Sequence, residues 1–202
     1  MPGVEGTRVR LANVILALWS VLIVAAGCCG NGRTLSVVPH PQETDHWCWA
    51  ASGEMVMHYL GRDVSQCTQV NDSLNRTNCP CTQCSNAVAN PSCLEYGWPN
   101  FGRYGFSFQR TSYAALTWTQ LKAEIDAGRP VAFTWQYAGG GGHIMVAIGY
   151  REIDGTRSVV VFNPLPVCQG DHEIITYEAY QSDANYSHWD DFYNIHPTPS
   201  SQ

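Results

Sequence analysis

Apolar residues in the first half of the chain recur at a spacing that favours helices. The run from Cys48 to Leu60 is mostly apolar and stops at Gly61, a common signal for the end of a helix. A second, shorter helix is predicted over Val64–Leu74, where Ser65 is a suitable N-cap. These two segments predict a helical region close to the N-terminal side of the fold.

The pattern of apolar residues changes from helical to strand-like after a third predicted helix. Thr117 and Gln120 have capping-box spacing, and the helix that they begin should end at Gly128. Asp154-Gly155 predicts a hairpin turn. Runs rich in β-branched and aromatic residues predict four strands, over Val131–Tyr137, His143–Tyr150, Ser158–Phe162 and Glu173–Tyr180. Helices first and antiparallel strands second predict an α+β fold with a helical N-terminal lobe and a β C-terminal lobe.

The remaining segments have no sustained period. Cys79–Gly105 is rich in Cys, Asn, Pro and Gly, and should be an irregular, cross-linked excursion. After Gln181 the chain is polar with scattered aromatic residues, so we expect that segment only to pack on the domain. The predicted organisation is a tether over 28–36, a single domain over 37–196 and a flexible tail over 197–202.

The first 27 residues predict an export signal that is not part of the fold. Arg8 and Arg10 precede the uncharged run Leu11–Gly27, which ends in small residues. Val24–Cys28 also resembles a bacterial lipobox, in which Cys28 is lipidated and becomes the new N-terminus. An uncleaved anchor is the alternative, although so short a run is at the lower limit for spanning a bilayer. We expect an exported, bacterial protein, either secreted or lipid-anchored at the cell envelope.

The charge pattern argues against nucleic acid as a partner. The chain has 11 Lys and Arg against 17 Asp and Glu, a formal net charge of −6, and Lys122 is its one lysine. Phosphate backbones are bound by clustered basic residues, and this chain has no basic run. Membrane contact is therefore expected only through the N-terminal signal or lipid.

The chain has nine cysteines, and their expected chemistry depends on the compartment. Setting aside Cys28 and Cys29 at the processing site, and Cys48, leaves six candidates for up to three disulfides, whose pairing the sequence does not determine. These are Cys67, Cys79, Cys81, Cys84, Cys93 and Cys168. The close spacing from Cys79 to Cys84 also fits a zinc site, but an exported chain favours disulfides.

Cys48 lies where a loop meets the first predicted helix. A thiol at a helix N-terminus faces the positive end of the macrodipole, and that position favours the thiolate. Gln42, six residues upstream, could donate its side-chain amide to an oxyanion beside the Cys48 backbone N–H. The alternative is that Cys48 is a buried cysteine that acts only as a small apolar residue.

A second segment contributes a candidate base. His143 opens an apolar strand directly after the glycines Gly139–Gly142, which allow another chain to come close. Asn163 ends the next strand and can accept a hydrogen bond from the imidazole, which would fix its tautomer. An ordinary Asn-Pro turn is the alternative for Asn163. His46 is nearer to Cys48 in sequence, but a residue two before a nucleophile rarely turns back to it.

The order Gln42, Cys48, His143, Asn163 resembles the papain-like cysteine proteases. The strings Trp47–Ser52, Val64–Cys67 and Gly142-His143 resemble the compact family typified by a bacterial avirulence effector protease, over roughly residues 37–180. The resemblance implies that Cys48 is the nucleophile, His143 its base, Gln42 the oxyanion donor and Asn163 the residue that orients the imidazole. Such relatives often have Asp where this chain has Asn163, so Asp at this position is expected to support activity.

These features predict an exported papain-like cysteine peptidase that hydrolyses peptide bonds in a peptide or protein substrate. We expect a monomer that needs no cofactor and no metal. The same constellation could run thiol-dependent acyl transfer or amide deconjugation, because only the second nucleophile differs. A catalytically silent peptide-binding module is an alternative of another class. The presence of all four expected site residues counts against that alternative.

Overall fold

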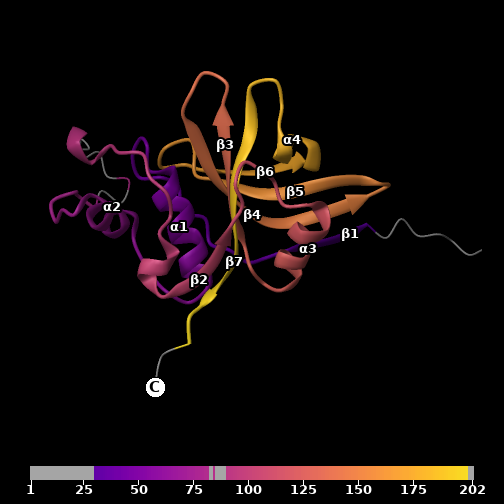
Figure 1. The fold of residues 1–202 in the computed structure, drawn as a ribbon, viewed down its shortest axis with the longest axis horizontal. Coiled ribbons are helices and arrows are strands. Elements are labelled where there is room, and N and C mark those ends of the chain that lie inside the picture. Colours follow the sequence, from indigo (N-terminus) through magenta and orange to yellow (C-terminus); the bar gives the residue numbers. More distant parts are fainter. Residues whose placement is uncertain (1–29, 82–83, 85–89, 200–202) are drawn as a thin grey trace, which may run out of the picture.

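The computed structural model describes residues 30–81, 84 and 90–199 (Figure 1). The predicted export signal and the lipidation candidate Cys28 lie outside these residues. The described elements are β1 (Asn31–Thr34), α1 (Cys48–Tyr59), α2 (Gln66–Leu74), η1 (Pro91–Cys93), η2 (Phe101–Tyr104), β2 (Phe106–Arg110), α3 (Trp118–Asp126), β3 (Val131–Tyr137), β4 (Gly142–Ile153), β5 (Thr156–Asn163), β6 (Asp171–Thr176), α4 (Tyr177–Gln181) and β7 (Tyr186–Pro197). None of the described helices has the length and apolar character needed to cross a membrane.

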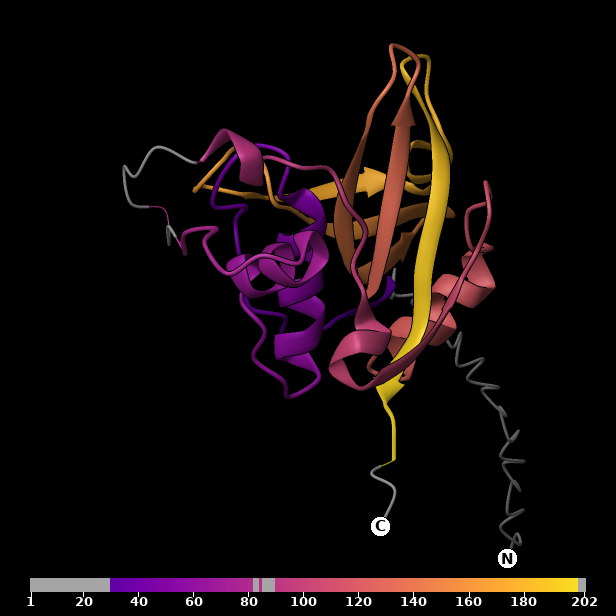
Figure 2. The same cartoon turned by 60° about the vertical axis from the view of Figure 1, so that its left-hand side comes forward.

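The strands of the described chain form one antiparallel sheet with the order β2-β7-β3-β4-β5-β6. Strand β4 is its centre: β5 lies along one edge, while β3 and then β1 lie along the other. Figure 2 shows β3 and β7 as long neighbouring ribbons, with the helices α1 and α2 to one side. The α+β fold predicted from the sequence is confirmed.

Helix α1 is enclosed between the sheet and α2. It packs on β4 and β3, and α2 packs on α1 from the other side. The Ser52 hydroxyl donates to the Ile144 carbonyl at 3.2 Å, which joins the helix to the start of β4. Gly53 faces α2 so closely that a Cβ there would lie 2.3 Å from the Gln69 Oε1. Burial on both sides explains why α1 is apolar around most of its circumference.

Several local predictions are confirmed. The Ser65 side chain caps α2 by accepting from the Thr68 backbone N–H. Thr117 and Gln120 form the predicted capping box of α3. Strand β3 has the predicted bounds. Asp154 and Gly155 both have positive φ, 50° and 79°, as a tight hairpin turn between β4 and β5 requires.

The strand predicted over Glu173–Tyr180 is wrong in its second half. Strand β6 begins earlier and ends at Thr176, and α4 follows it. The Thr176 side chain accepts from the Ala179 N–H and so caps the helix. Tyr177 and Tyr180 are buried by this turn of helix. The capping interaction and this burial therefore outweigh the β-propensity of the run.

The segment after Gln181 is also more regular than expected. It forms β7, which lies between β2 and β3 inside the sheet. The sequence did not predict this strand because its buried polar residues break the apolar pattern. In the fold, those residues have hydrogen-bond or ion-pair partners inside the protein. Asp191 is fully buried and accepts from the Tyr180 hydroxyl and the Leu116 N–H. Asp190 pairs with the Arg110 guanidinium on the neighbouring strand. A polar sequence can therefore form an interior strand when its partners come from other elements.

Both ends of the domain differ from the expected organisation. Part of the segment 28–36, expected to be a tether, forms β1 and pairs with the second half of β4. At the other end β7 extends to Pro197, within the expected flexible tail over 197–202. The Thr198 N–H and hydroxyl both donate to the Gly105 carbonyl, which holds the chain directly after β7.

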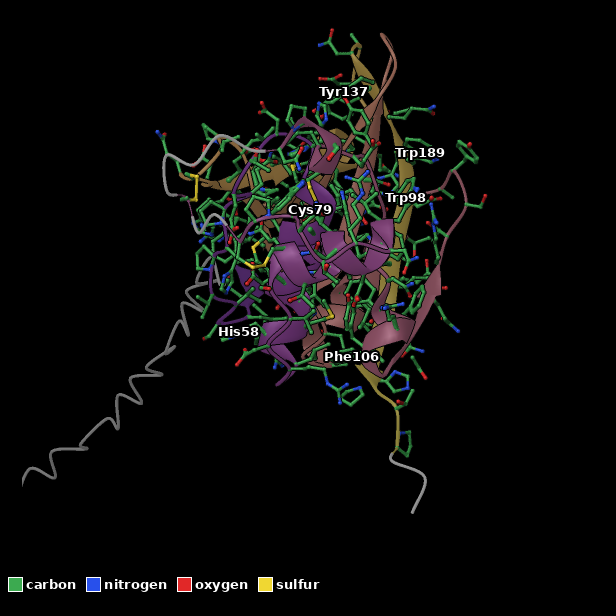
Figure 3. The ribbon with its side chains drawn as sticks, turned by 90° about the vertical axis from the view of Figure 1, so that its left-hand side faces the viewer. His58, Cys79, Trp98, Phe106, Tyr137 and Trp189 are labelled. Atoms are coloured by element: carbon green, nitrogen blue, oxygen red, sulfur yellow. A yellow bond between two sulfur atoms is a disulfide. The ribbon has the colours of Figure 1, made fainter. Side chains whose placement is uncertain are left out.

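The predicted disulfide cysteines are paired as Cys67–Cys81, Cys79–Cys93 and Cys84–Cys168. The three closely spaced cysteines of the alternative zinc site therefore bond to three different partners. The first two bridges lie within the helical lobe, where Cys79 is labelled in Figure 3. The third ties this lobe to the loop between β5 and β6. Cys48 is the free cysteine of the described chain.

Candidate active site

Cys48 is the first residue of α1 and is only 8% exposed. The tryptophans on either side of it hold a facing loop in place. The Trp47 indole donates to the Cys93 carbonyl at 2.8 Å, and the Trp49 indole donates to the Glu95 carbonyl at 3.1 Å. Because Cys93 is also disulfide-bonded to Cys79, the loop that follows it is anchored twice beside the thiol.

The charge state of Cys48 differs from the sequence expectation. Burial raises the pKa of the Cys48 thiol above its ordinary value. Hydrogen bonding to the backbone of Ile144, Trp49 and Cys48 lowers that pKa, as expected at a helix N-terminus, but does not outweigh burial. The resting residue is therefore a neutral thiol at neutral pH. It needs a nearby base to become a nucleophile.

His143 lies at the start of β4 and is 5% exposed. Its Nε2 is 2.7 Å from the Asn163 Oδ1 at the end of β5. The Asn163 Oδ1 also accepts from the Leu165 backbone N–H, so this atom is the carbonyl oxygen of the amide. The His143 Nε2 must therefore carry the proton, which leaves the Nδ1 lone pair free to act as a base. Burial lowers the pKa of His143, so the ring is neutral at neutral pH.

Gln42 is held by its backbone and directs its side chain into the site. Its N–H donates to the Pro164 carbonyl, and its carbonyl accepts from the Cys168 N–H. One N–H of the side-chain Nε2 donates a hydrogen bond to the Thr44 carbonyl at 2.9 Å. A second proton remains on this nitrogen. Gln42 is 3% exposed, so this donor is positioned in a largely dry environment.

Two adjoining cavities meet at Cys48 and His143. The first, of about 270 Å³, is lined by these two residues together with Gln42. The second, of about 200 Å³, has an aromatic wall formed by Trp49, Tyr96, Trp98 and Trp189. The structure thus brings the four residues singled out in the sequence to one place: three line the first cavity, and Asn163 binds the imidazole from behind.

The aromatic wall is built by segments far apart in the sequence. Trp98 and Trp189 meet edge to face at 4.9 Å, and their side chains lie close together in Figure 3. The Arg110 guanidinium covers the Trp98 ring at 4.0 Å. Gly142 lies against this wall, because a Cβ there would be 2.7 Å from the Trp135 carbonyl oxygen and 3.2 Å from the Trp189 ring. No periodic signal in the sequence marks these residues as a group.

His46 also lines the first cavity, but both of its ring nitrogens are engaged by other groups. Its ring is stacked on Tyr96 and is hydrogen-bonded to the Leu94 carbonyl and the Tyr96 hydroxyl. The residue that sequence reasoning missed is Glu173, whose carboxylate accepts from the Asn163 Nδ2 at 2.7 Å. Its position directly across from Val161 on β5 could be found only once the strand register was known.

An α+β fold with a free cysteine at a helix N-terminus and a histidine on the adjoining strand is consistent with a papain-like cysteine peptidase. A family model described as "Peptidase_C39 like family" matches residues 34–194, which is most of the chain, so the chain belongs to this family. Membership supports its assignment as a cysteine peptidase. The narrower resemblance to the effector-protease family stays a prediction. The comparison with curated proteins gave no significant match.

Proposed function

We propose that the chain is an exported cysteine peptidase that hydrolyses peptide bonds through Cys48, His143, Asn163 and Gln42. The observation that carries this proposal is one cavity lined by a thiol, a free imidazole nitrogen and a buried amide donor. The three disulfides are compatible with export. The substrate is a peptide or protein, and the enzyme acts as a monomer.

The first half of the reaction forms an acyl-enzyme. The His143 Nδ1 takes the proton of the Cys48 thiol, and the sulfur attacks the peptide carbonyl carbon. The resulting oxyanion accepts hydrogen bonds from the Cys48 backbone N–H and the remaining Gln42 Nε2 proton. His143 then gives its proton to the leaving nitrogen as the C–N bond breaks, which leaves a thioester.

The second half releases the acyl group. A water molecule gives a proton to the His143 Nδ1 and attacks the thioester carbon. When the tetrahedral intermediate collapses, the carboxylic acid leaves and the Cys48 sulfur regains its proton from the imidazole. Throughout, the His143 Nε2–H stays bonded to Asn163, so the ring keeps one orientation while its other nitrogen gains and loses a proton.

Digestion of a peptide library with the wild type and with Cys48→Ala, read by mass spectrometry, tests the proposal. Products that depend on Cys48 and carry a new carboxyl terminus support hydrolysis. Products joined to an added amine, in place of free acids, would instead make the enzyme an acyltransferase. A chain that cleaves nothing and whose Cys48 reacts with iodoacetamide no faster than a free thiol would be a binding module.

Gln42→Ala should lower kcat by about 10²–10³, because a buried oxyanion donor acts mainly on the transition state. Gln42→Glu is the matched variant, since it keeps the size of the side chain but loses both N–H donors. Gln42→Glu should lose at least as much kcat as Gln42→Ala in steady-state assays on one peptide, because its carboxylate also repels the oxyanion and faces the Thr44 carbonyl. A change confined to KM would place Gln42 in substrate binding.

The aromatic cavity beside Cys48 fits an apolar side chain of the substrate. Trp189→Ala should therefore lower kcat/KM for peptides with a large apolar residue near the cut by about tenfold or more. Peptides with a small residue at that position should be cleaved almost as well as by the wild type. Assays on a matched peptide pair measure this ratio, and Trp189→Phe should retain most of the preference. Equal losses on both peptides would contradict this role.

A further inference from the structure

The Asn163 amide is held on both of its ends. Its Oδ1 accepts from the His143 Nε2 at 2.7 Å and from the Leu165 N–H at 3.0 Å. Its Nδ2 donates to the Glu173 Oε1 at 2.7 Å. A chain of hydrogen bonds therefore runs from β4 through β5 to β6, and it ends on a carboxylate. The mechanism above uses only the first link of this chain.

Resting on the proposed function, we propose that Glu173 is a positioning residue. Its carboxylate holds the Asn163 amide and places one negative charge behind the His143 imidazole. Asn163 is itself neutral. The Glu173 charge polarises its amide, which strengthens the Oδ1 as an acceptor for the His143 Nε2–H. The pair Asn163 and Glu173 thus does together what a single carboxylate in contact with the ring would do alone.

The surroundings of the imidazole support this role. Burial lowers the pKa of His143, whereas the Asn163 hydrogen bond and the charge of Glu173 raise it. The other titratable groups near the ring and this carboxylate are Asp45 and His46 just before α1, Cys48 on α1, Tyr96, Tyr137 on β3 and Tyr186 on β7. The pKa values of Tyr137 and Tyr186 are raised, first by burial, so both are neutral at neutral pH. Of the carboxylates near the ring, Glu173 is the one whose charge raises the pKa of His143, so it stabilises the imidazolium while the ring holds the proton of Cys48.

The contact also changes the sequence expectation for Asp at position 163. A carboxylate introduced there would lie where the Asn163 amide now donates to Glu173, so two carboxylates would meet at hydrogen-bond distance. Such a pair shares one proton or is forced apart. Asn163→Asp alone should therefore be impaired, because the bond that orients the imidazole then depends on the protonation of the pair.

Glu173→Gln is the first variant to measure. Glutamine can still accept from the Asn163 Nδ2, so the bond remains and only the charge is lost. The pKa of His143 should be lower than in the wild type. NMR of the imidazole ring measures this pKa, and the His143→Ala variant identifies its signal. The acid limb of Cys48 alkylation and of kcat/KM should move to lower pH with it, with kcat reduced and KM unchanged. Glu178→Gln on α4 is the control and should move neither.

The double variant Asn163→Asp/Glu173→Gln reverses the direction of the contact. The introduced glutamine amide would donate to the introduced, ionised aspartate, so the hydrogen bond and the single negative charge are both restored. We expect this variant to recover most of the activity lost by each single variant. A coupling of about tenfold fits residues of one hydrogen-bond network, which couple by factors of roughly 2 to 150. Losses that simply multiply in the double variant would overturn the proposal, as would a Glu173→Gln enzyme with the wild-type pH profile.

Two of these readouts need no substrate, so the inference and the proposed function can fail separately. If the wild type cleaves no peptide but the His143 titration and the alkylation profile shift in Glu173→Gln, the peptidase assignment fails and the role of Glu173 stands. If the wild type is an active peptidase and the ring titration is the same in both proteins, Glu173 has only a structural role.

Discussion

Replacing Cys48 by alanine is expected to abolish turnover while leaving the fold intact. The side chain is small, lies at the N-terminus of α1 and is not disulfide-bonded. The loss of one sulfur atom therefore removes little packing. Chemically, it removes the atom that forms the acyl-enzyme. The loss of kcat should be on the order of 10⁶, as for nucleophiles that act as a unit with their base. Single-turnover assays beside a circular dichroism melt measure both effects.

His143→Ala should cost about as much as Cys48→Ala, because the buried Cys48 is a neutral thiol and has to be deprotonated by the imidazole. The double variant should be no slower than either single variant. His196→Ala is a suitable control, since this histidine is exposed at the far end of β7. Losses that add on a logarithmic scale would mean that Cys48 and His143 act independently.

Reduction of the disulfides should produce the largest loss of stability. In the chain-entropy account a bridge that spans 14 residues contributes about 3 kcal/mol, and one that spans 84 contributes about 4.5 kcal/mol. Replacing Cys84 and Cys168 by alanine should therefore lower the free energy of unfolding more than replacing Cys67 and Cys81. Urea titration of the two double variants, with wild type as reference, measures the difference.

The bridges should also differ in their effect on activity. Cys168 donates its N–H to the Gln42 carbonyl, and the Cys93 carbonyl accepts from the Trp47 indole beside Cys48. Breaking either of these two bridges should lower kcat in addition to stability. The Cys67–Cys81 bridge serves as the internal control, and its loss should act mainly on stability. Thiol counting on denatured protein without residues 1–29 should give one free thiol, Cys48. Several free thiols together with bound zinc would contradict the disulfide pairing.

The sequence by itself predicted several of the local elements and four residues of the candidate site. Helix caps at Ser65 and Thr117 and the turn at Asp154-Gly155 act within a few residues, so they can be read from short patterns. The order of Gln42, Cys48 and His143 was informative for a different reason. Cys48 and His143 each stand at the boundary of an apolar element, where burial alone does not explain a polar residue, and Gln42 lies six residues before Cys48.

Only the tertiary structure decided what depends on pairing between distant segments. The polar run of β7 is a central strand because Arg110, Leu116 and Tyr180 satisfy its carboxylates, and all three belong to other segments. The three disulfides required the loop between β5 and β6 to meet the helical lobe. Glu173 lies close enough to contact Asn163 only because of the register in which β6 pairs with β5. Likewise, burial of Cys48 outweighs the helix N-terminus that favoured its thiolate, because desolvation depends on the whole surrounding fold.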